Sequence, residues 1–238
     1  MNKQGNSYTF IFATIMVVVV ATLLAFVSQS LKPRQDRNVL VAQKSDILQS
    51  VNIFVPTDEV EDVYDDIIGE SSYIVNFSGE RVEGEALEVN MQREVRKSLD
   101  ERNFPVYEAT LESGEIKYIL QVRGNGLWGP LWGYVSVNDD GTTIYGATFD
   151  HAGETPGLGA EIANRSFQDQ FSGKKIFDDS GELVSIAVVK GGAPEGDSHA
   201  VDGISGGTIT AEGLEDMLLN NFKGYEQFLK NIERNSHE

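Results

Sequence analysis

The 238-residue chain contains no cysteine. This absence excludes disulfides, thiol nucleophiles, iron–sulfur clusters and c-type haem attachment within the chain. If electrons pass through this protein, an organic cofactor must therefore carry them. The absence does not indicate a compartment, because a chain without cysteine is compatible with reducing and oxidising surroundings alike.

Basic residues are also scarce. The chain has 19 Lys and Arg against 37 Asp and Glu, which gives a formal net charge of −18. Nucleic acid and anionic lipid headgroups would repel such a surface, so no nucleic-acid partner is expected. The few histidines, His151, His199 and His237, have no metal-ligand spacing, and no metal site is predicted. A Walker loop and a Gly-x-Ser-x-Gly elbow are also missing, so neither ATPase nor hydrolase chemistry is indicated.

One long hydrophobic run lies near the N-terminus. Residues from Tyr8 to Val27 carry no charge, and as a helix they are long enough to cross about 30 Å of hydrocarbon. The alternative is a cleaved signal peptide, but this run exceeds the roughly 7–15 apolar residues of such a peptide. We predict a transmembrane anchor in 1–30, a linker with a juxtamembrane helix in 31–56, and one soluble domain in 57–238.

The soluble part alternates strand-like and helical patterns, which predicts an α+β fold. A hairpin is expected around Glu112-Ser113-Gly114, and a second tight turn at 138–141. A final helix is expected to be interrupted near Gly224. The other predicted elements are strands at 73–77 and 183–189 and a helix at 87–99.

The stretch from Asp202 to Thr210 is the strongest candidate for a binding site. A glycine-rich loop meets a helical pattern at four of its residues, Ser205, Gly206, Gly207 and Thr208. Small residues let a backbone approach a bulky anion, and the free N–H groups of a helix start can hold a phosphate. The alternative is an ordinary turn that caps a helix.

Four further features are considered as candidate sites, and one of them is rejected. Residues 151–159 contain three glycines and a proline and predict a shaped loop that includes Thr155 and Leu158. Residues 124–129 match the dinucleotide pattern G-x-G-x-x-G, but a strand follows them where a helix is required, so the match is false. Trp128 and Trp132 offer flat apolar surface to a ring, or pack in the core. Lys190 leaves a strand end into glycines, where it meets a phosphate or is solvated.

Several of these segments resemble one protein family. Residues 205–208 resemble the Ser/Thr-Gly-Ala-Thr motif of bacterial flavoproteins that carry FMN on the last threonine, with Gly207 where the family usually has Ala. Residues 154–159, 126–134 and 31–35 also resemble family segments. The whole chain is similar to the C-subunit family of Na⁺-translocating NADH:quinone reductases, and the resemblance implies an FMN-binding domain on a single transmembrane helix.

The resemblance further implies roles for particular residues. Thr208 would carry covalent FMN through its phosphate, while Ser205, Gly206 and Gly207 shape the loop. Thr155, Leu158, Lys190 and Trp128 would be further contacts with FMN. Asp202 belongs to the motif and would serve recognition by the flavin transferase that adds FMN from FAD.

The family also implies partners and a location. The chain would relay single electrons between other subunits of a multi-subunit NADH:quinone reductase in the bacterial inner membrane, with no complete activity alone. Its soluble domain would be periplasmic. Lys32, Arg34 and Arg37 follow the apolar run and only Lys3 precedes it, so charge counting favours a cytoplasmic domain instead. We expect the periplasmic orientation that the family implies.

Two alternatives remain open. The G subunit of the related ferredoxin-oxidising complex has the same plan and cofactor. A membrane-tethered assembly module without flavin would use Thr208 only to cap a helix.

Overall fold

The computed structural model describes residues 5–236, with side chains described up to Arg234. It divides into two compact units, Met1–Gln43 and Lys44–Glu238. The three-part division predicted from the sequence stays a prediction. His237, one of the three histidines, lies outside the described residues.

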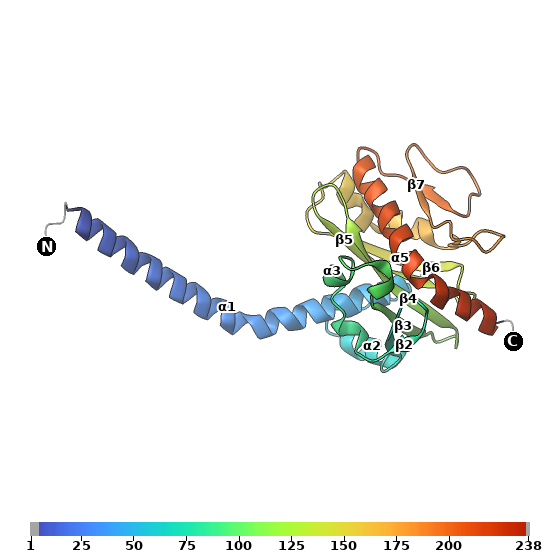
Figure 1. The fold of residues 1–238 in the computed structure, drawn as a ribbon, viewed down its shortest axis with the longest axis horizontal. Helices are drawn as coiled ribbons and strands as arrows, with labels where there is room; N and C mark the ends of the chain where they lie inside the picture. The colour runs from blue at the N-terminus through green and yellow to red at the C-terminus, as the bar shows by residue number, and fades with distance from the viewer. Residues whose placement is uncertain (1–4, 237–238) are drawn as a thin grey trace. The chain divides into compact units, whose positions relative to one another are not determined.

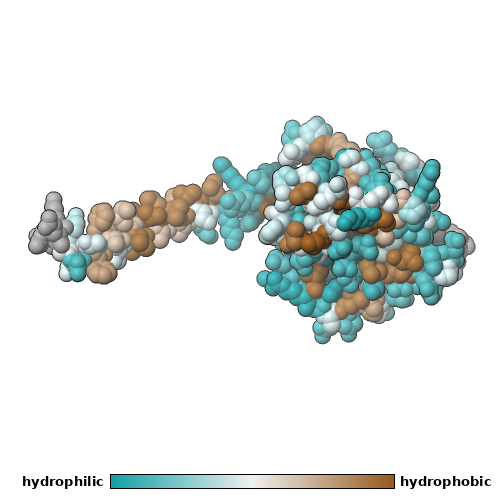
Figure 2. Space-filling model, turned by 90° about the horizontal axis from the view of Figure 1, so that it is seen from above, coloured by the Kyte–Doolittle hydropathy of each residue, from teal (hydrophilic) through white to brown (hydrophobic). Residues whose placement is uncertain are grey.

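The first unit consists of most of helix α1 (Asn6–Ser50). Its apolar side chains from Phe10 to Leu31 are exposed, and Figure 2 shows them as a continuous hydrophobic stretch with polar residues at either end. By length and composition this helix is able to span a membrane. The helix continues through Pro33, so the segment predicted as a mostly helical linker is helical up to Ser50.

The second unit is built on a six-stranded sheet in the order β2-β1-β3-β4-β5-β6, with every neighbouring pair antiparallel. A separate pair, β7 and β8, is parallel. The strands are β1 (Ser72–Val75), β2 (Arg81–Val82), β3 (Phe104–Thr110), β4 (Ile116–Asn125), β5 (Pro130–Val137), β6 (Ile144–His151), β7 (Ala187–Val189) and β8 (Ala200–Asp202).

The remaining helices are short apart from the last one. The α-helices are α2 (Val60–Ile67), α3 (Met91–Glu94), α4 (Arg165–Gln168) and α5 (Thr208–Ser236), and the 3₁₀ helices are η1 (Ala86–Glu88), η2 (Leu99–Glu101), η3 (Gly159–Ala163) and η4 (Asp169–Phe171). Together with the sheet they confirm the predicted α+β class.

Helix α5 covers one face of the sheet (Figure 1). Its apolar residues, among them Leu214, Leu218 and Phe222, are fully buried in a core with Leu120 and Val122 of β4. The opposite face meets the last turns of α1, where the Ser136 hydroxyl donates to the Ser50 carbonyl. The centre of the sheet is therefore covered on both faces, which explains why consecutive residues of β5 from Gly133 to Val137 are buried rather than alternating between buried and exposed.

The prediction that the final helix breaks near Gly224 is wrong, because α5 is continuous from Thr208 to Ser236. Gly224 is instead a point at which the helix approaches the sheet closely. A Cβ built at Gly224 would overlap the ring of Phe104. The cost of glycine within a helix is offset here by the packing that the missing side chain permits.

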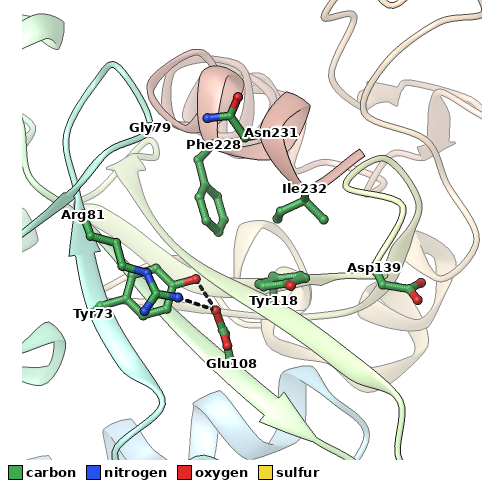
Figure 3. A pocket seen from close by; sticks show the side chains of 9 residues that line it. All are labelled: Tyr73, Gly79, Arg81, Glu108, Tyr118, Asp139, Phe228, Asn231 and Ile232. Atoms are coloured by element: carbon green, nitrogen blue, oxygen red, sulfur yellow. Dashed lines mark hydrogen bonds and ion pairs between the residues drawn. The ribbon is translucent and has the colours of Figure 1, made fainter. Parts of the chain in front are cut away.

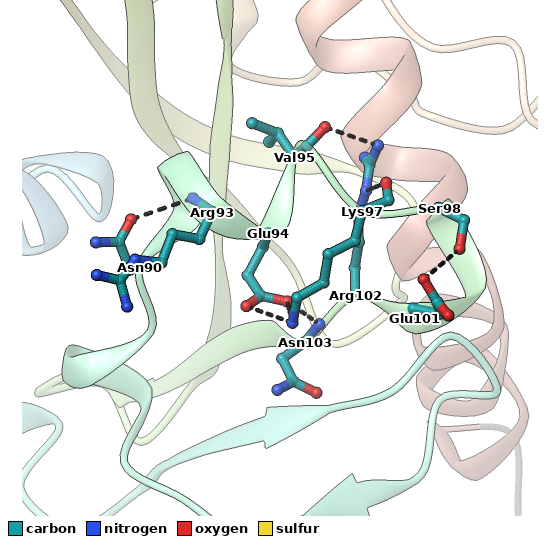
Figure 4. A network of polar contacts seen from close by, with 9 residues as sticks. All are labelled: Asn90, Arg93, Glu94, Val95, Lys97, Ser98, Glu101, Arg102 and Asn103. Carbon is teal, nitrogen blue, oxygen red and sulfur yellow. Dashed lines mark hydrogen bonds and ion pairs between the residues drawn. The ribbon is translucent and has the colours of Figure 1, made fainter.

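The helix predicted at 87–99 is also wrong, since α3 contains only Met91–Glu94. Figure 4 shows the polar network that replaces it. The Glu94 carboxylate accepts from Lys97 Nζ at 2.8 Å and from the Asn103 backbone N at 2.8 Å. Arg102 donates to the carbonyls of Val95 and Lys97. The Val95 carbonyl would accept from residue 99 in the predicted helix, so the Arg102 side chain has taken the place of a helical donor there.

The strand predicted at 183–189 is reduced to β7. Ser185 has φ of 62°, in the left-handed region, and its backbone N donates to the Ile176 carbonyl. A left-handed residue cannot continue an extended strand. The chain therefore turns at Ser185, and only Ala187–Val189 pairs with β8.

Substitution Gly224→Ala is expected to destabilise the fold by about 1–3 kcal/mol, because its methyl group overlaps Phe104 and the helix must shift. Lys223→Ala, at an exposed position of the same helix, is the matched control and is expected to change stability by less than about 0.5 kcal/mol. Urea unfolding measures both. Equal stability of the two variants would contradict the close packing of α5.

Substitution Asp46→Asn is expected to stabilise the fold near neutral pH. Burial and the neighbouring Asp150 carboxylate raise the pKa of Asp46 from 3.8 to about 6. Because the folded chain holds this proton more tightly than the unfolded chain, stability is highest below the unfolded pKa and is lost as the pH rises through about 6. The amide removes that loss, a gain of about 1–2 kcal/mol after allowance for partial exposure. The gain should shrink as the pH of urea unfolding falls from about 6 towards 4, and a gain independent of pH would contradict this explanation.

Candidate functional site

Two cavities adjoin at the first turn of α5. The first, which we name the glycine pocket, has a volume of about 410 Å³ and is lined by Lys190, Gly191, Gly192, Asp202, Gly203, Ile204, Ser205, Gly206 and Thr208. The second, which we name the tryptophan pocket, has a volume of about 220 Å³ and is lined by Leu127, Trp128, Glu154, Thr155, Leu158, Gly159, Gly206, Gly207, Thr208, Ile209 and Thr210. Gly206 and Thr208 line both, so Thr208 stands where the two pockets meet.

The structure brings all of the predicted site residues to these two pockets. Ser205 and Lys190 line the glycine pocket. Gly207, Thr155, Leu158 and Trp128 line the tryptophan pocket. Trp132, considered with Trp128 as a flat apolar surface, lines a different cavity of about 200 Å³ that includes Asp46. Only Trp128 of the two is at Thr208.

The loop before α5 has the backbone geometry that its glycines allow. Gly206 has φ of 74°, and a Cβ there would lie 2.5 Å from Cδ2 of Leu158. Gly207 N donates to the Ile204 carbonyl at 3.1 Å, and Ala211 N to the Gly207 carbonyl at 2.9 Å, which begins the helix. The N–H groups of the first helical turn have no helical acceptor, and the helix dipole is positive here. This end of α5 is therefore suited to an anionic group.

The tryptophan pocket has an apolar rim. Leu127, Leu158 and Ile209 are exposed, and 68% of Trp128 is exposed. Large apolar side chains that cluster on a surface mark a binding site for an apolar or aromatic group. The half-buried Thr208 thus has a pocket suited to an anion on one side and a pocket suited to a flat ring on the other.

Polar contacts hold the loops of the glycine pocket in place. Oδ1 of Asp202 accepts from the Ala193 backbone N at 2.8 Å, and the Asp202 backbone N donates to Oε1 of Gln170 at 2.8 Å. Oε2 of Glu215 accepts from the Val188 N at 2.8 Å, which ties β7 to α5. Lys190 is exposed beside this pocket. Gln170 and Glu215 were not predicted as site residues, because nothing local indicates which distant backbone group each one binds.

Glu154 is a further site residue that was not predicted. Its side chain is buried and lines the tryptophan pocket, where Oε1 accepts from the Trp128 backbone N at 2.8 Å. Oε2 accepts from the Thr210 hydroxyl at 2.6 Å. The available signal was that Glu154 is the one acidic residue in the loop 151–159.

The cavity of about 470 Å³ in Figure 3 contains none of the predicted residues. The Arg81 guanidinium lies 3.5 Å from the centre of the Tyr73 ring and 3.0 Å from Oε1 of Glu108. The Tyr73 hydroxyl also donates to Glu108. The polar groups of Tyr73, Arg81 and Glu108 thus bind one another at one side of this cavity.

Known proteins are similar to this chain in sequence, including the part that forms the two pockets. The family model described as an FMN-binding domain matches residues 126–222. The C subunit of the Na(+)-translocating NADH-quinone reductase of Vibrio anguillarum is 33% identical over 251 aligned residues, which cover 97% of this chain and 96% of that protein. The matched range 126–222 begins at the β4–β5 hairpin, ends within α5 and includes every residue that lines the two pockets.

Solved structures of C subunits are similar to this chain in fold as well as in sequence. The crystal structure of the C subunit of the Na(+)-translocating NADH-quinone reductase from Parabacteroides distasonis is 47% identical with a TM-score of 0.77, covering 84% of this chain and 96% of that chain. The crystal structure of Shewanella oneidensis NqrC is 26% identical with a TM-score of 0.69, covering 81% of this chain and 99% of that chain.

Substitution Gly206→Ala is expected to destabilise the loop before α5 by about 1–2 kcal/mol, because alanine disfavours a positive φ and its methyl group would overlap Leu158. Gly153→Ala is the matched control, since a Cβ there has no neighbour within 4 Å. Thermal or urea unfolding of both variants measures the difference. A Gly206→Ala protein as stable as the control would contradict this loop geometry.

Proposed function

Since the chain belongs to the C-subunit family of Na(+)-translocating NADH-quinone reductases, we propose that it carries FMN covalently bound through the phosphate to Thr208. The observation that carries this proposal is the position of Thr208 at the meeting point of the glycine pocket and the tryptophan pocket. A phosphodiester on this side chain has a helix N-terminus beside it, and an apolar rim within reach of the attached ring.

In this proposal the glycine pocket binds the phosphate of FMN and the tryptophan pocket binds its isoalloxazine ring. Ser205, Gly206 and Gly207 form the turn that admits the phosphate close to the backbone, and Lys190 supplies positive charge at the glycine pocket. Trp128, Leu158 and Thr155 contact the isoalloxazine ring in the tryptophan pocket. When bound, FMN would supply the ability to accept and donate electrons one at a time.

Attachment is a group transfer with no net oxidation. The Thr208 oxygen forms a bond to the FMN phosphorus of FAD, and the pyrophosphate bond of FAD breaks. AMP leaves, and the hydroxyl proton of Thr208 is released. A flavin transferase catalyses this step in the proposal, with Asp202 as part of the sequence it recognises. Covalent attachment keeps the cofactor on an exposed site whose two pockets are open to solvent.

The apolar part of α1 anchors the chain in the bacterial inner membrane. Its exposed apolar side chains need a hydrocarbon surrounding, and their run is long enough to span one. The domain that follows is periplasmic in this proposal, against the charge count, because partner subunits can determine the topology of a single helix. The relatives are components of NADH-quinone reductases, so this chain relays electrons between partner subunits while NADH oxidation and quinone reduction occur elsewhere.

The proposal is tested by the intact mass of the full chain co-expressed with its flavin transferase. The wild type is expected to gain the mass of FMN minus water. Thr208→Ala is expected to gain nothing, and Thr208→Ser, which keeps a hydroxyl, is expected to retain at least part of the modification. An unmodified wild type would contradict covalent attachment. If the Thr208→Ala protein still gains the mass of FMN minus water, FMN is attached at a residue other than Thr208.

A further inference from the structure

Glu154 connects three segments that build the tryptophan pocket. It stands in the loop after β6, and its carboxylate binds the Trp128 backbone N of the β4–β5 hairpin at 2.8 Å and the Thr210 hydroxyl of α5 at 2.6 Å. Its own backbone N donates to Nδ1 of His151 at 3.1 Å. The carboxylate therefore fixes the rim residue Trp128 relative to the helical turn that begins with Thr208.

The space around this carboxylate is made by glycines. A Cβ at Gly126 would lie 2.6 Å from Oε1 of Glu154, and a Cβ at Gly159 would lie 2.6 Å from Oε2. Any larger residue at either position would push the side chain away. The hairpin and the loop thus leave a slot that fits a carboxylate and nothing bulkier beside it.

The Glu154 carboxylate is buried and forms no ion pair with a described residue. Only 5% of the residue is exposed. Both donors to it are neutral. A buried charge held only by neutral donors is costly, and its field extends into the neighbouring pocket with little screening.

We propose that Glu154 is a positioning residue of the flavin site, which aligns Trp128 with Thr208 and whose negative charge makes the bound FMN harder to reduce. This inference rests on the proposed function. Electrons added to the ring increase its negative charge, and a fixed negative charge at the pocket wall opposes that increase. Replacement of the carboxylate by an amide therefore shifts the midpoint potential to more positive values.

The test compares Glu154→Gln with Glu161→Gln in the full chain, co-expressed with the flavin transferase. Glu161 is a matched control because it stands in the same region and its carboxylate binds the Gly157 N and Asn164, but it lines neither pocket. Intact mass gives the fraction that carries FMN, and spectroelectrochemical titration gives the midpoint potential of that fraction. We expect a positive shift for Glu154→Gln and the wild-type potential for Glu161→Gln.

Thr210→Val separates the positioning role from the charge. It removes one donor to Glu154 at nearly constant volume and leaves the carboxylate in place. We expect slower FMN attachment by the transferase than in the wild type, with a smaller change in potential than in Glu154→Gln. If Glu154→Gln does not fold, Thr210→Val alone tests the inference. A Thr210→Val protein with the wild-type rate of FMN attachment and the wild-type midpoint potential would then overturn it.

Two results with the loaded variants would overturn the inference. A loaded Glu154→Gln protein with the wild-type midpoint potential would do so and leave the proposed function intact. An equal shift in Glu161→Gln would also overturn it, because the effect would then be one of overall charge. A wild-type chain without FMN would instead contradict the proposed function itself.

Discussion

The close approach of α5 to β4 is the constraint on which the rest of the second unit depends. Glycines on both elements make it possible. A Cβ at Gly213 would overlap the Asn125 carbonyl O, and a Cβ at Gly124 would lie 2.6 Å from the Met217 Cβ. Because Gly224 provides a similar contact further along, the helix is held to the sheet along much of its length. Its first turn is consequently fixed beside the β4–β5 hairpin, where Trp128 stands.

The site follows from this packing. Residues near positions 128, 155, 190 and 208 are far apart in sequence, and the fixed helix start brings them to two adjoining pockets. One pocket is rich in glycine beside the positive end of the helix dipole, and the other has an apolar rim. This division matches a cofactor with an anionic phosphate and a flat ring. Contacts from Glu154, Asp202 and Glu215 hold the loops in that arrangement.

Patterns that depend on local chemistry were predictable from the sequence. The hairpin around residues 112–114 is confirmed by the pairing of β3 with β4, and the turn at 138–141 by the bond from Gly141 N to the Asn138 carbonyl. The start of the final helix after the Ser-Gly-Gly loop is confirmed at Thr208. Patterns whose outcome depends on tertiary contacts could not be predicted from the sequence. A glycine in a helical pattern predicts a break, but Gly224 lies in a continuous helix because it packs against Phe104, which is distant in sequence.

Contacts between residues that are distant in sequence also explain which features of the site could not be predicted. Glu154 binds groups 26 and 56 residues away, so no local pattern reveals its contacts. The helix predicted at 87–99 is shorter because the Asn90 side chain caps its start, and because Arg102, which lies beyond the predicted range, binds the Val95 carbonyl. The role of each predicted residue in binding FMN stays a prediction, although the residues themselves lie together.

The most direct measurement is an experimental structure of the flavinylated full chain. We predict density continuous from the Thr208 oxygen to the FMN phosphate, with the isoalloxazine ring in the tryptophan pocket against Trp128 and Leu158. A ring lying instead in the glycine pocket over Gly191 and Gly192, or a phosphate attached at another residue, would contradict the proposed arrangement.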